Sequence, residues 1–399
     1  MHLTPRTPRP APSDLLTIAA IVLLGLNLRP VLAAIGPLLG AIQAATGISS
    51  GNAGLLTSVP VFAMGVCALL GARLQRRLGS YRGVALGIAV VAVACALRAA
   101  AHGTAGLMAT AALGGLGIAL VQALLPAFIK RHFPRRAGQL MGLYTTGIMG
   151  GAALAAASAA PLAQQLGWSA ALALWGVPAL LAALVWVKVA GAHPAGGAAA
   201  AVGLPLRSPR AWLLLVFFGI GTGAYTLVLA WLPPFFMQLG WSAADSGLLL
   251  GALTLTEVLA GLTVSAVINA LPDRRVPLVL ALLSALAGLA CLIAAPAALA
   301  VPATVLLGGG IGALFPLTLI VTMDQVRDPA GAGALLGFVQ GGGYMIASLM
   351  PFVAGLIREQ TASLGQAWMV MAGGVVVLLA LTARLAPPGR IAGAAVPAS

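Results

Sequence analysis

The chain has 399 residues, of which 61% are apolar and only 7% are charged, and its mean hydropathy is +1.06. Its 21 Lys and Arg and 7 Asp and Glu residues are too few to cover a water-soluble globule, where about 25% of residues are charged. These values exclude a soluble enzyme, a nucleic-acid-binding domain and a disordered chain, and they indicate an integral membrane protein.

Continuous apolar runs rich in Leu and Ala predict membrane-spanning helices, each of which needs about 20 apolar residues. We expect twelve such helices. In chain order they are 15–40, 53–72, 83–101, 104–129, 138–160, 169–190, 211–237, 246–269, 276–296, 300–322, 333–357 and 366–386. Because this number is even, both ends of the chain are expected on the same side of the membrane.

Basic residues gather in alternate loops, which predicts the orientation. Eighteen of the 21 Lys and Arg residues fall in segments on the side of the N-terminus, and only Arg358 falls on the other side. Such an asymmetry predicts that both termini are cytoplasmic, because positively charged loops stay inside. We therefore expect a multi-pass protein of a bacterial-type inner (plasma) membrane.

A long segment rich in small and basic residues between spans six and seven predicts a flexible linker. It divides the chain almost in half. The predicted parts are a cytoplasmic N-terminal tail at 1–14, a six-helix bundle at 15–190, a cytoplasmic linker at 191–210, a second six-helix bundle at 211–386 and a cytoplasmic C-terminal tail at 387–399.

The two halves resemble each other. The Gly-Ile-Ser at 47–49 and the Gly-Leu-Leu at 54–56 return as Gly-Trp-Ser at 240–242 and Gly-Leu-Leu at 247–249. Since six spans separate the copies, both halves have the same orientation. This predicts an all-α membrane protein of two parallel six-helix bundles, with a site between them near mid-membrane, which is the architecture of the major facilitator superfamily.

An Asn-x-Arg-Pro motif lies at 27–30 in the first span, and Gly-Pro-Leu-Leu follows at 36–39. This segment resembles the first helix of the cyanate/nitroimidazole transporter family within that superfamily. Further matches lie at 54–61, 122–126, 129–133, 230–233, 315–317 and 340–341. The resemblance implies alternating access, a cavity lined by helix one, and a small anion or small polar solute, cyanate-like or nitroimidazole-like, as substrate.

Arg29 is the most conspicuous residue of the membrane-spanning segments. Counted from Leu15 at about 1.5 Å per residue, it lies roughly 21 Å into a helix that crosses about 30 Å of hydrocarbon. A charge at that depth costs about 2.5 kcal/mol or more to insert, so we expect it to bind an anionic substrate. The alternative is a structural arginine bonded to backbone carbonyls that Pro30 frees.

Glu257 is the only acid deep within a span, about 16 Å below Ser246. We expect it to be a proton-coupling residue or the electrostatic partner of Arg29 in the absence of substrate. Alternatively, it is a structural carboxyl bonded to a neighbouring helix.

Six further polar and aromatic residues are candidates for contact with the substrate, and packing between helices is the alternative for each. They are Asn27, Gln122, Tyr144, Tyr225, Trp231 and Gln340. Trp231 is expected to act as a gate, because Pro233 and Pro234 are expected to break or bend the helix just beyond it. Arg98 is expected to extend to the outer interface rather than to bind substrate.

No metal-ligand spacing, catalytic triad or nucleotide motif is visible, so no metal and no cofactor are expected, and any uphill transport must use a gradient. The favoured hypothesis is a monomeric secondary transporter whose partners are a small anionic substrate, the lipid bilayer and protons, with no nucleic acid. A multidrug-type exporter with Glu257 as proton carrier is the alternative. A membrane enzyme would need a cluster of acids, His or Cys near one membrane face, which is not seen.

Overall fold

The computed structural model describes residues 12–101, 103–190, 203–271, 273–326 and 329–385, and every regular element in these ranges is a helix. Twelve helical segments there are long and apolar enough to cross a membrane. The prediction of an all-α fold with twelve spans is therefore confirmed. The predicted linker and tails lie largely outside the described residues, so their boundaries and the orientation of the termini stay predictions.

Six spans make up the N-terminal half, several of them divided into two or three helices. Its helices are α1 (Pro12–Leu28), α2 (Pro30–Ala33), α3 (Ile35–Thr46), α4 (Ser50–Leu69), α5 (Gly71–Leu78), α6 (Ser80–Leu97), α7 (Thr104–His132), α8 (Ala137–Leu166), α9 (Trp168–Leu174) and α10 (Gly176–Ala190).

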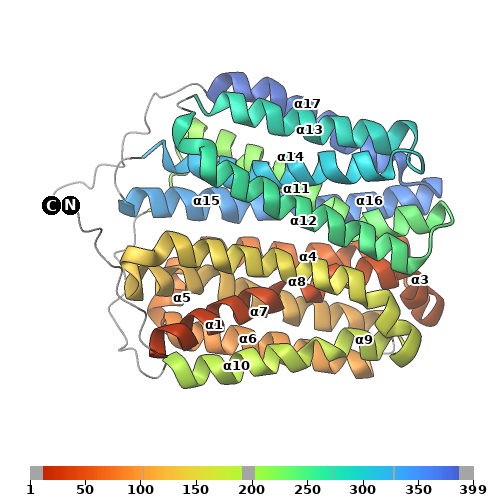
Figure 1. Cartoon of the computed structure of the whole chain (residues 1–399), viewed down its shortest axis with the longest axis horizontal. Coiled ribbons are helices and arrows are strands. Elements are labelled where there is room, and N and C mark those ends of the chain that lie inside the picture. Colours follow the sequence, from red (N-terminus) through yellow and green to blue (C-terminus); the bar gives the residue numbers. More distant parts are fainter. Residues whose placement is uncertain (1–11, 102, 191–202, 272, 327–328, 386–399) are drawn as a thin grey trace, which may run out of the picture.

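Six spans also make up the C-terminal half, which lies beside the first half in Figure 1. Its helices are α11 (Pro209–Gln238), α12 (Ala243–Val267), α13 (Arg275–Ala294), α14 (Ala300–Met323), α15 (Pro329–Ala347), α16 (Leu349–Thr361) and α17 (Gly365–Thr382).

The first span is broken, although the sequence predicts one helix over 15–40. The helical hydrogen-bond pattern is interrupted at Arg29 and again at Ala34, which leaves the four-residue α2 between α1 and α3. Pro30 has no N–H to donate to the preceding turn. The carbonyl of Arg29 instead starts α2, accepting the N–H groups of Leu32 at 3.0 Å and Ala33 at 2.9 Å. The break therefore lies at the residue that carries the buried charge.

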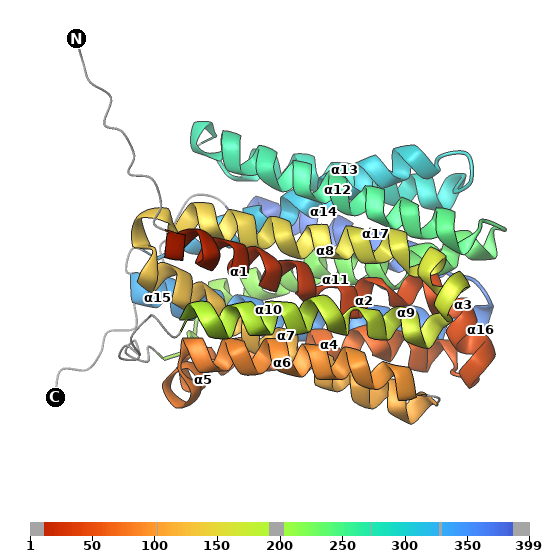
Figure 2. The same cartoon turned by 60° about the horizontal axis from the view of Figure 1, so that its bottom comes forward.

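The two halves meet along two seams, and the first joins α8 to α12. We call the end of the molecule that holds Thr46 and Thr361 the distal end, and the opposite end the proximal end. Near the distal end, α8 and α12 are so close that a Cβ at Gly247 would collide with the carbonyl of Ala156. Near the proximal end, a Cβ at Gly142 of α8 would meet nothing within 4 Å. Figures 1 and 2 both show the two helices diverging towards the proximal end.

The second seam joins α4 to α15 and α16, and it is tight over most of its length. At the distal end, a Cβ at Gly54 would collide with the carbonyl of Pro351. Nearer the proximal end, a Cβ at Gly65 would lie 2.6 Å from the carbonyl oxygen of Gly341. The structure is thus closed between the halves at the distal end and splayed at the proximal end along one seam only.

Candidate functional site

Arg29 lies between the two halves and has no polar partner among the described residues. Its side chain is 4% exposed, and its guanidinium carbon lies 5.2 Å from the centroid of the Tyr225 ring of α11. Nε is buried without a hydrogen bond, and no hydrogen bond or ion pair of this side chain is found in the described part of the chain. The alternative interpretation, in which main-chain carbonyls take up the guanidinium protons, finds no support in this geometry.

Glu257 faces the same region from α12. It is 4% exposed, and both carboxyl oxygens are buried without a hydrogen-bond partner among the described residues. The carboxyl lies within electrostatic range of Arg29 and Tyr225, yet no ion pair joins it to Arg29 in the residues that the structure covers. A cation and an acid from opposite halves are therefore close enough to influence each other but do not neutralise each other by direct contact.

Three tyrosines lie around Arg29, and one of them, Tyr344, is not among the residues that the sequence predicts. Tyr144 of α8 and Tyr225 of α11, both predicted, have buried hydroxyls without partners. Tyr344 of α15 lies within electrostatic range of Arg29 and of both other tyrosines. The sequence signal that could have found Tyr344 is its position one helical turn after Gln340. Arg29 thus lies among phenol groups from both halves.

Aromatic rings continue this wall inside the C-terminal half. The Phe218 ring packs edge-on against Tyr344 with 5.3 Å between centroids, and it lies 5.7 Å from the ring of Phe315. The site therefore combines one fixed positive charge, one acid and a mostly aromatic wall.

The predicted amides are placed less centrally. Asn27 uses its amide within its own helix, donating to the carbonyl of Leu23 at 2.7 Å. Gln122 of α7 and Gln340 of α15 are half-buried, and Oε1 of Gln122 is buried without a partner in the described chain. Their contact with substrate stays a prediction.

Trp231 lies on the distal side of the site rather than beside Arg29. It is 1% exposed, and its indole Nε1–H donates to the carbonyl of Pro351 at 2.8 Å. Helix α11 continues through Pro233 and Pro234 to Gln238, so the two prolines do not break it. A bend at these prolines stays a prediction. The carbonyl of Leu229, which Pro233 leaves without its helical partner, lies close to Gly36 of α3. The role of Trp231 as a gate stays a prediction.

The expectation for Arg98 is wrong. Its side chain is 2% exposed, and its Nη1–H donates to the carbonyl of Val31 at 2.9 Å. Val31 lies in the short α2, whose ends leave carbonyls without helical partners. The arginine therefore stays inside the bundle, where it supports the broken first span, instead of extending to the interface.

Within the described residues, no group of three or more His, Cys, Asp or Glu side chains could hold a metal ion. The glycine runs of the sequence lie inside helices, where they allow close packing. Gly312 of α14, for example, lies against the backbone of Glu257.

Comparison with known proteins agrees with this architecture. Residues 15–351 match the model of the Major Facilitator Superfamily. The chain is 38% identical to the cyanate transport protein CynX of Escherichia coli over 93% of this chain and 97% of that protein. It is 31% identical to the 2-nitroimidazole transporter of Escherichia coli over 92% of this chain and 93% of that protein.

Solved structures support the fold alone, since their sequence identities are low. A D-xylose–proton symporter superposes with a TM-score of 0.79 at 13% identity, over 94% of this chain and 98% of that one. A bacterial homologue of the lysosomal transporter Spinster, in an inward-facing and occupied conformation, gives 0.77 at 15% identity, over 94% and 97%. The chain is thus a multi-pass transporter of the inner membrane that takes a small-molecule substrate, and its relatives are transporters rather than enzymes. It belongs to the major facilitator superfamily and, within it, to the cyanate/nitroimidazole transporter family.

Proposed function

We propose that this transporter carries a small monovalent anion, cyanate or one of similar size, by alternating access around Arg29. One observation carries the proposal: the Arg29 guanidinium is buried between the halves and has no polar partner among the described residues. A buried charge without a partner is costly. An anion that arrives from either side would relieve that cost.

The position of the Arg29 guanidinium over the Tyr225 ring supports an anionic ligand. A guanidinium that lies against an aromatic ring keeps its N–H groups in the plane of the fork, where they donate to a small anion. The unpartnered hydroxyls of Tyr144 and Tyr225 can donate further hydrogen bonds to the same ligand.

Glu257 is proposed to couple transport to protons. An ionised Glu257 would attract the Arg29 guanidinium, which lies within its electrostatic range. The same negative charge would repel an anion that approaches the guanidinium. Protonation removes this competition, so the anion and the proton bind together. Both then cross in the same direction, and the loaded carrier has the same net charge as the empty one in which Glu257 is ionised.

The test is uptake of radiolabelled cyanate into proteoliposomes, with and without a pH gradient. Arg29→Ala is expected to reduce uptake to the level of empty liposomes, and Arg29→Lys to raise KM by roughly tenfold because the stacked fork is lost. Glu257→Gln is expected to retain exchange across equal concentrations but to lose accumulation driven by the pH gradient. Arg77→Ala removes an exposed arginine of α5 and serves as the control.

Two results would contradict this proposal separately. Normal cyanate uptake by Arg29→Ala would rule out the central anion site. Accumulation by Glu257→Gln under a pH gradient would show that another group carries the proton, and the anion site would still stand.

A small planar heteroaromatic solute is the second candidate, because Tyr225, Tyr344 and Phe218 form a wall on which a flat ring can stack. The relative named a 2-nitroimidazole transporter supports this possibility. Competition of 2-nitroimidazole with labelled cyanate distinguishes the two, since a shared site predicts mutual inhibition. Neither relative described above is named a multidrug exporter, so that hypothesis is not favoured.

A further inference from the structure

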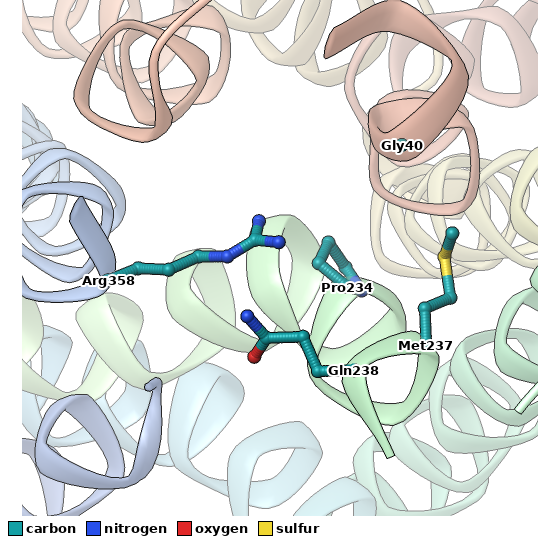
Figure 3. A pocket seen from close by; sticks show the side chains of 5 residues that line it. All are labelled: Gly40, Pro234, Met237, Gln238 and Arg358. Carbon is teal, nitrogen blue, oxygen red and sulfur yellow. The ribbon is translucent and has the colours of Figure 1, made fainter. Parts of the chain in front are cut away.

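A cavity lies in the seam between the halves, at the distal end. Its volume is about 150 Å³, and it is lined by α3, the end of α11 and α16 (Figure 3). The lining residues are Gly40, Pro234, Met237, Gln238 and Arg358. Gly40 and Gln238 are exposed, so the cavity is open to the distal surface. Its volume suffices for an anion of a few atoms, since one water molecule takes about 30 Å³.

Arg358 supplies the charge of this cavity. It is half-buried, and its Nη1 is buried without a hydrogen-bond partner in the described chain. Its guanidinium carbon lies 5.4 Å from the centroid of the Trp231 ring. Figure 3 shows this guanidinium pointing into the cavity, with the Gln238 side chain pointing towards it from α11.

The adjacent acid does not neutralise Arg358. Glu359 instead accepts the backbone N–H of Gly51 at 2.9 Å, across the seam in α4. No ion pair of Arg358 is found among the described residues. The cavity therefore contains a positive charge with unused hydrogen-bond donors.

The position of Arg358 is unusual for a membrane protein. In the predicted topology it is the single basic residue of the outer loops, where Lys and Arg are rare. An arginine that only anchors the helix would extend along the lipid-facing surface to the headgroups. This one points instead into a cavity that both halves line.

Helix α11 links this cavity to the central site. Arg29 lies over the ring of Tyr225 and Arg358 over the ring of Trp231, and a separation of six residues corresponds to about 9 Å along the helix axis. Trp231 is 1% exposed, and its position on α11 is between Tyr225 and the cavity residue Pro234. The guanidinium groups of Arg29 and Arg358 thus follow one another along α11, and the buried indole of Trp231 lies beside that of Arg358.

We propose that the distal cavity is an outer binding site for a small monovalent anion, held by the charge of Arg358. The anion is bound there while the distal end is closed, and it moves to Arg29 when that end opens. That this anion is the transported one rests on the proposed function, whereas binding of an anion in the cavity does not.

The test measures anion binding without transport. Gln238→Cys is made in a background of Cys67→Ala, Cys95→Ala and Cys291→Ala and purified in an uncharged detergent, which removes lipid phosphate as a ligand. The rates of modification by an anionic and by a neutral methanethiosulfonate reagent are compared, with and without sodium nitrate at constant ionic strength. The comparison is repeated with Arg358→Gln and with the control Arg77→Gln, which removes the same charge from exposed α5.

The modification rate with the anionic reagent, divided by the rate with the neutral reagent, is expected to fall at least about tenfold in Arg358→Gln. One focused charge changes the local anion concentration by that order. This ratio should not change in Arg77→Gln. Nitrate is expected to slow modification in the protein that retains Arg358, a result that does not depend on the folding of any Arg358 variant. Three results would each overturn the outer site. They are an unchanged ratio in Arg358→Gln, a lack of protection by nitrate, and failure of the neutral reagent to modify the cysteine at position 238.

Arg29→Gln separates this inference from the proposed function. It is expected to lose cyanate uptake while the reagent ratio and the protection at position 238 persist. If Arg29→Gln keeps uptake, the central site fails, and the reagent ratio still decides the outer one. In transport assays, Arg358→Gln is expected to raise KM for cyanate severalfold with little change in maximal rate, because it removes binding before the central step.

Discussion

The arginines within the helical bundle have different partners, and the partner determines the role of each. Arg98 donates to the carbonyl of Val31, so its guanidinium stabilises the backbone of the broken first span. Arg29 and Arg358 lie against aromatic rings instead, which leaves their N–H groups for a ligand. A guanidinium in a membrane is thus structural where it meets a carbonyl and available for an anion where it meets a ring.

Arg98→Met should destabilise the protein. The Val31 carbonyl would be left buried without its partner, at a cost of about 1–3 kcal/mol. The melting temperature in detergent, measured by scanning fluorimetry, should fall by several degrees, whereas Arg98→Lys should recover part of the loss. An unchanged melting temperature would show that the hydrogen bond to Val31 contributes little.

At the scale of helices, glycines determine how closely α12 and α14 approach each other. Gly308 of α14 lies against Thr256, and Gly312 lies against the backbone of Glu257 itself. The acid is therefore held in place by helix packing rather than by hydrogen bonds, since its own oxygens have none among the described residues. The position of Glu257 should therefore depend on Gly312, which does not contact the proposed ligand.

Gly312→Ala tests that dependence. The added methyl group would collide with the backbone of Glu257 and push α12 away from α14, which should cost about 1–3 kcal/mol of stability. Cyanate accumulation driven by a pH gradient should fall more than equal exchange does. Gly309→Ala is the matched control, because a Cβ there would meet its nearest neighbour, Oγ of Ser284, at 3.6 Å. Equal effects of the two substitutions would argue against placement of Glu257 by Gly312.

The sequence is sufficient to predict the twelve spans and to single out Arg29 and Glu257, because these follow from hydropathy and from the cost of a buried charge. It does not predict which groups meet across the halves. Tyr344 joins Arg29 only through the packing of α15 against the first half, and Arg98 finds Val31 only because α1 breaks at Arg29. Contacts of this kind depend on tertiary geometry, which a single sequence does not contain.

For the whole molecule, closure at the distal end rests on small residues and backbone contacts between the halves. Gly247 meets Ala156 at one seam, and Gly54 meets Pro351 at the other. A hydrogen bond from the Gly51 N–H to the Glu359 carboxylate adds a polar contact between the halves at this end. Because such contacts are broken without exposing buried charges, the closed distal end can separate at modest cost.

Gly247→Ala should shift the protein towards a conformation open at the distal end. The added methyl group would collide with the Ala156 carbonyl, which the closed form cannot accommodate without moving α8 from α12. Spin labels at the exposed positions Leu166 and Leu248, in a cysteine-free background, report the separation of these helices by pulsed electron resonance. Longer distances should become more populated.

Gly142→Ala serves as the control in that measurement, because a Cβ there meets nothing within 4 Å. Its distance distribution should match that of the protein without either alanine. If Gly247→Ala gives the same distribution too, the seam at Ala156 does not limit opening.

The inequality of the two seams has a consequence for how the halves move. Since α4 stays in contact with α15 and α16 over most of its length while α8 and α12 diverge towards the proximal end, the halves should swing about an axis that follows α4 rather than tilt symmetrically. Helices far from that axis then travel furthest, and α12 carries Glu257. Glu257 would then move relative to Arg29, so that each cycle changes the distance between the two charges as a direct result of the motion.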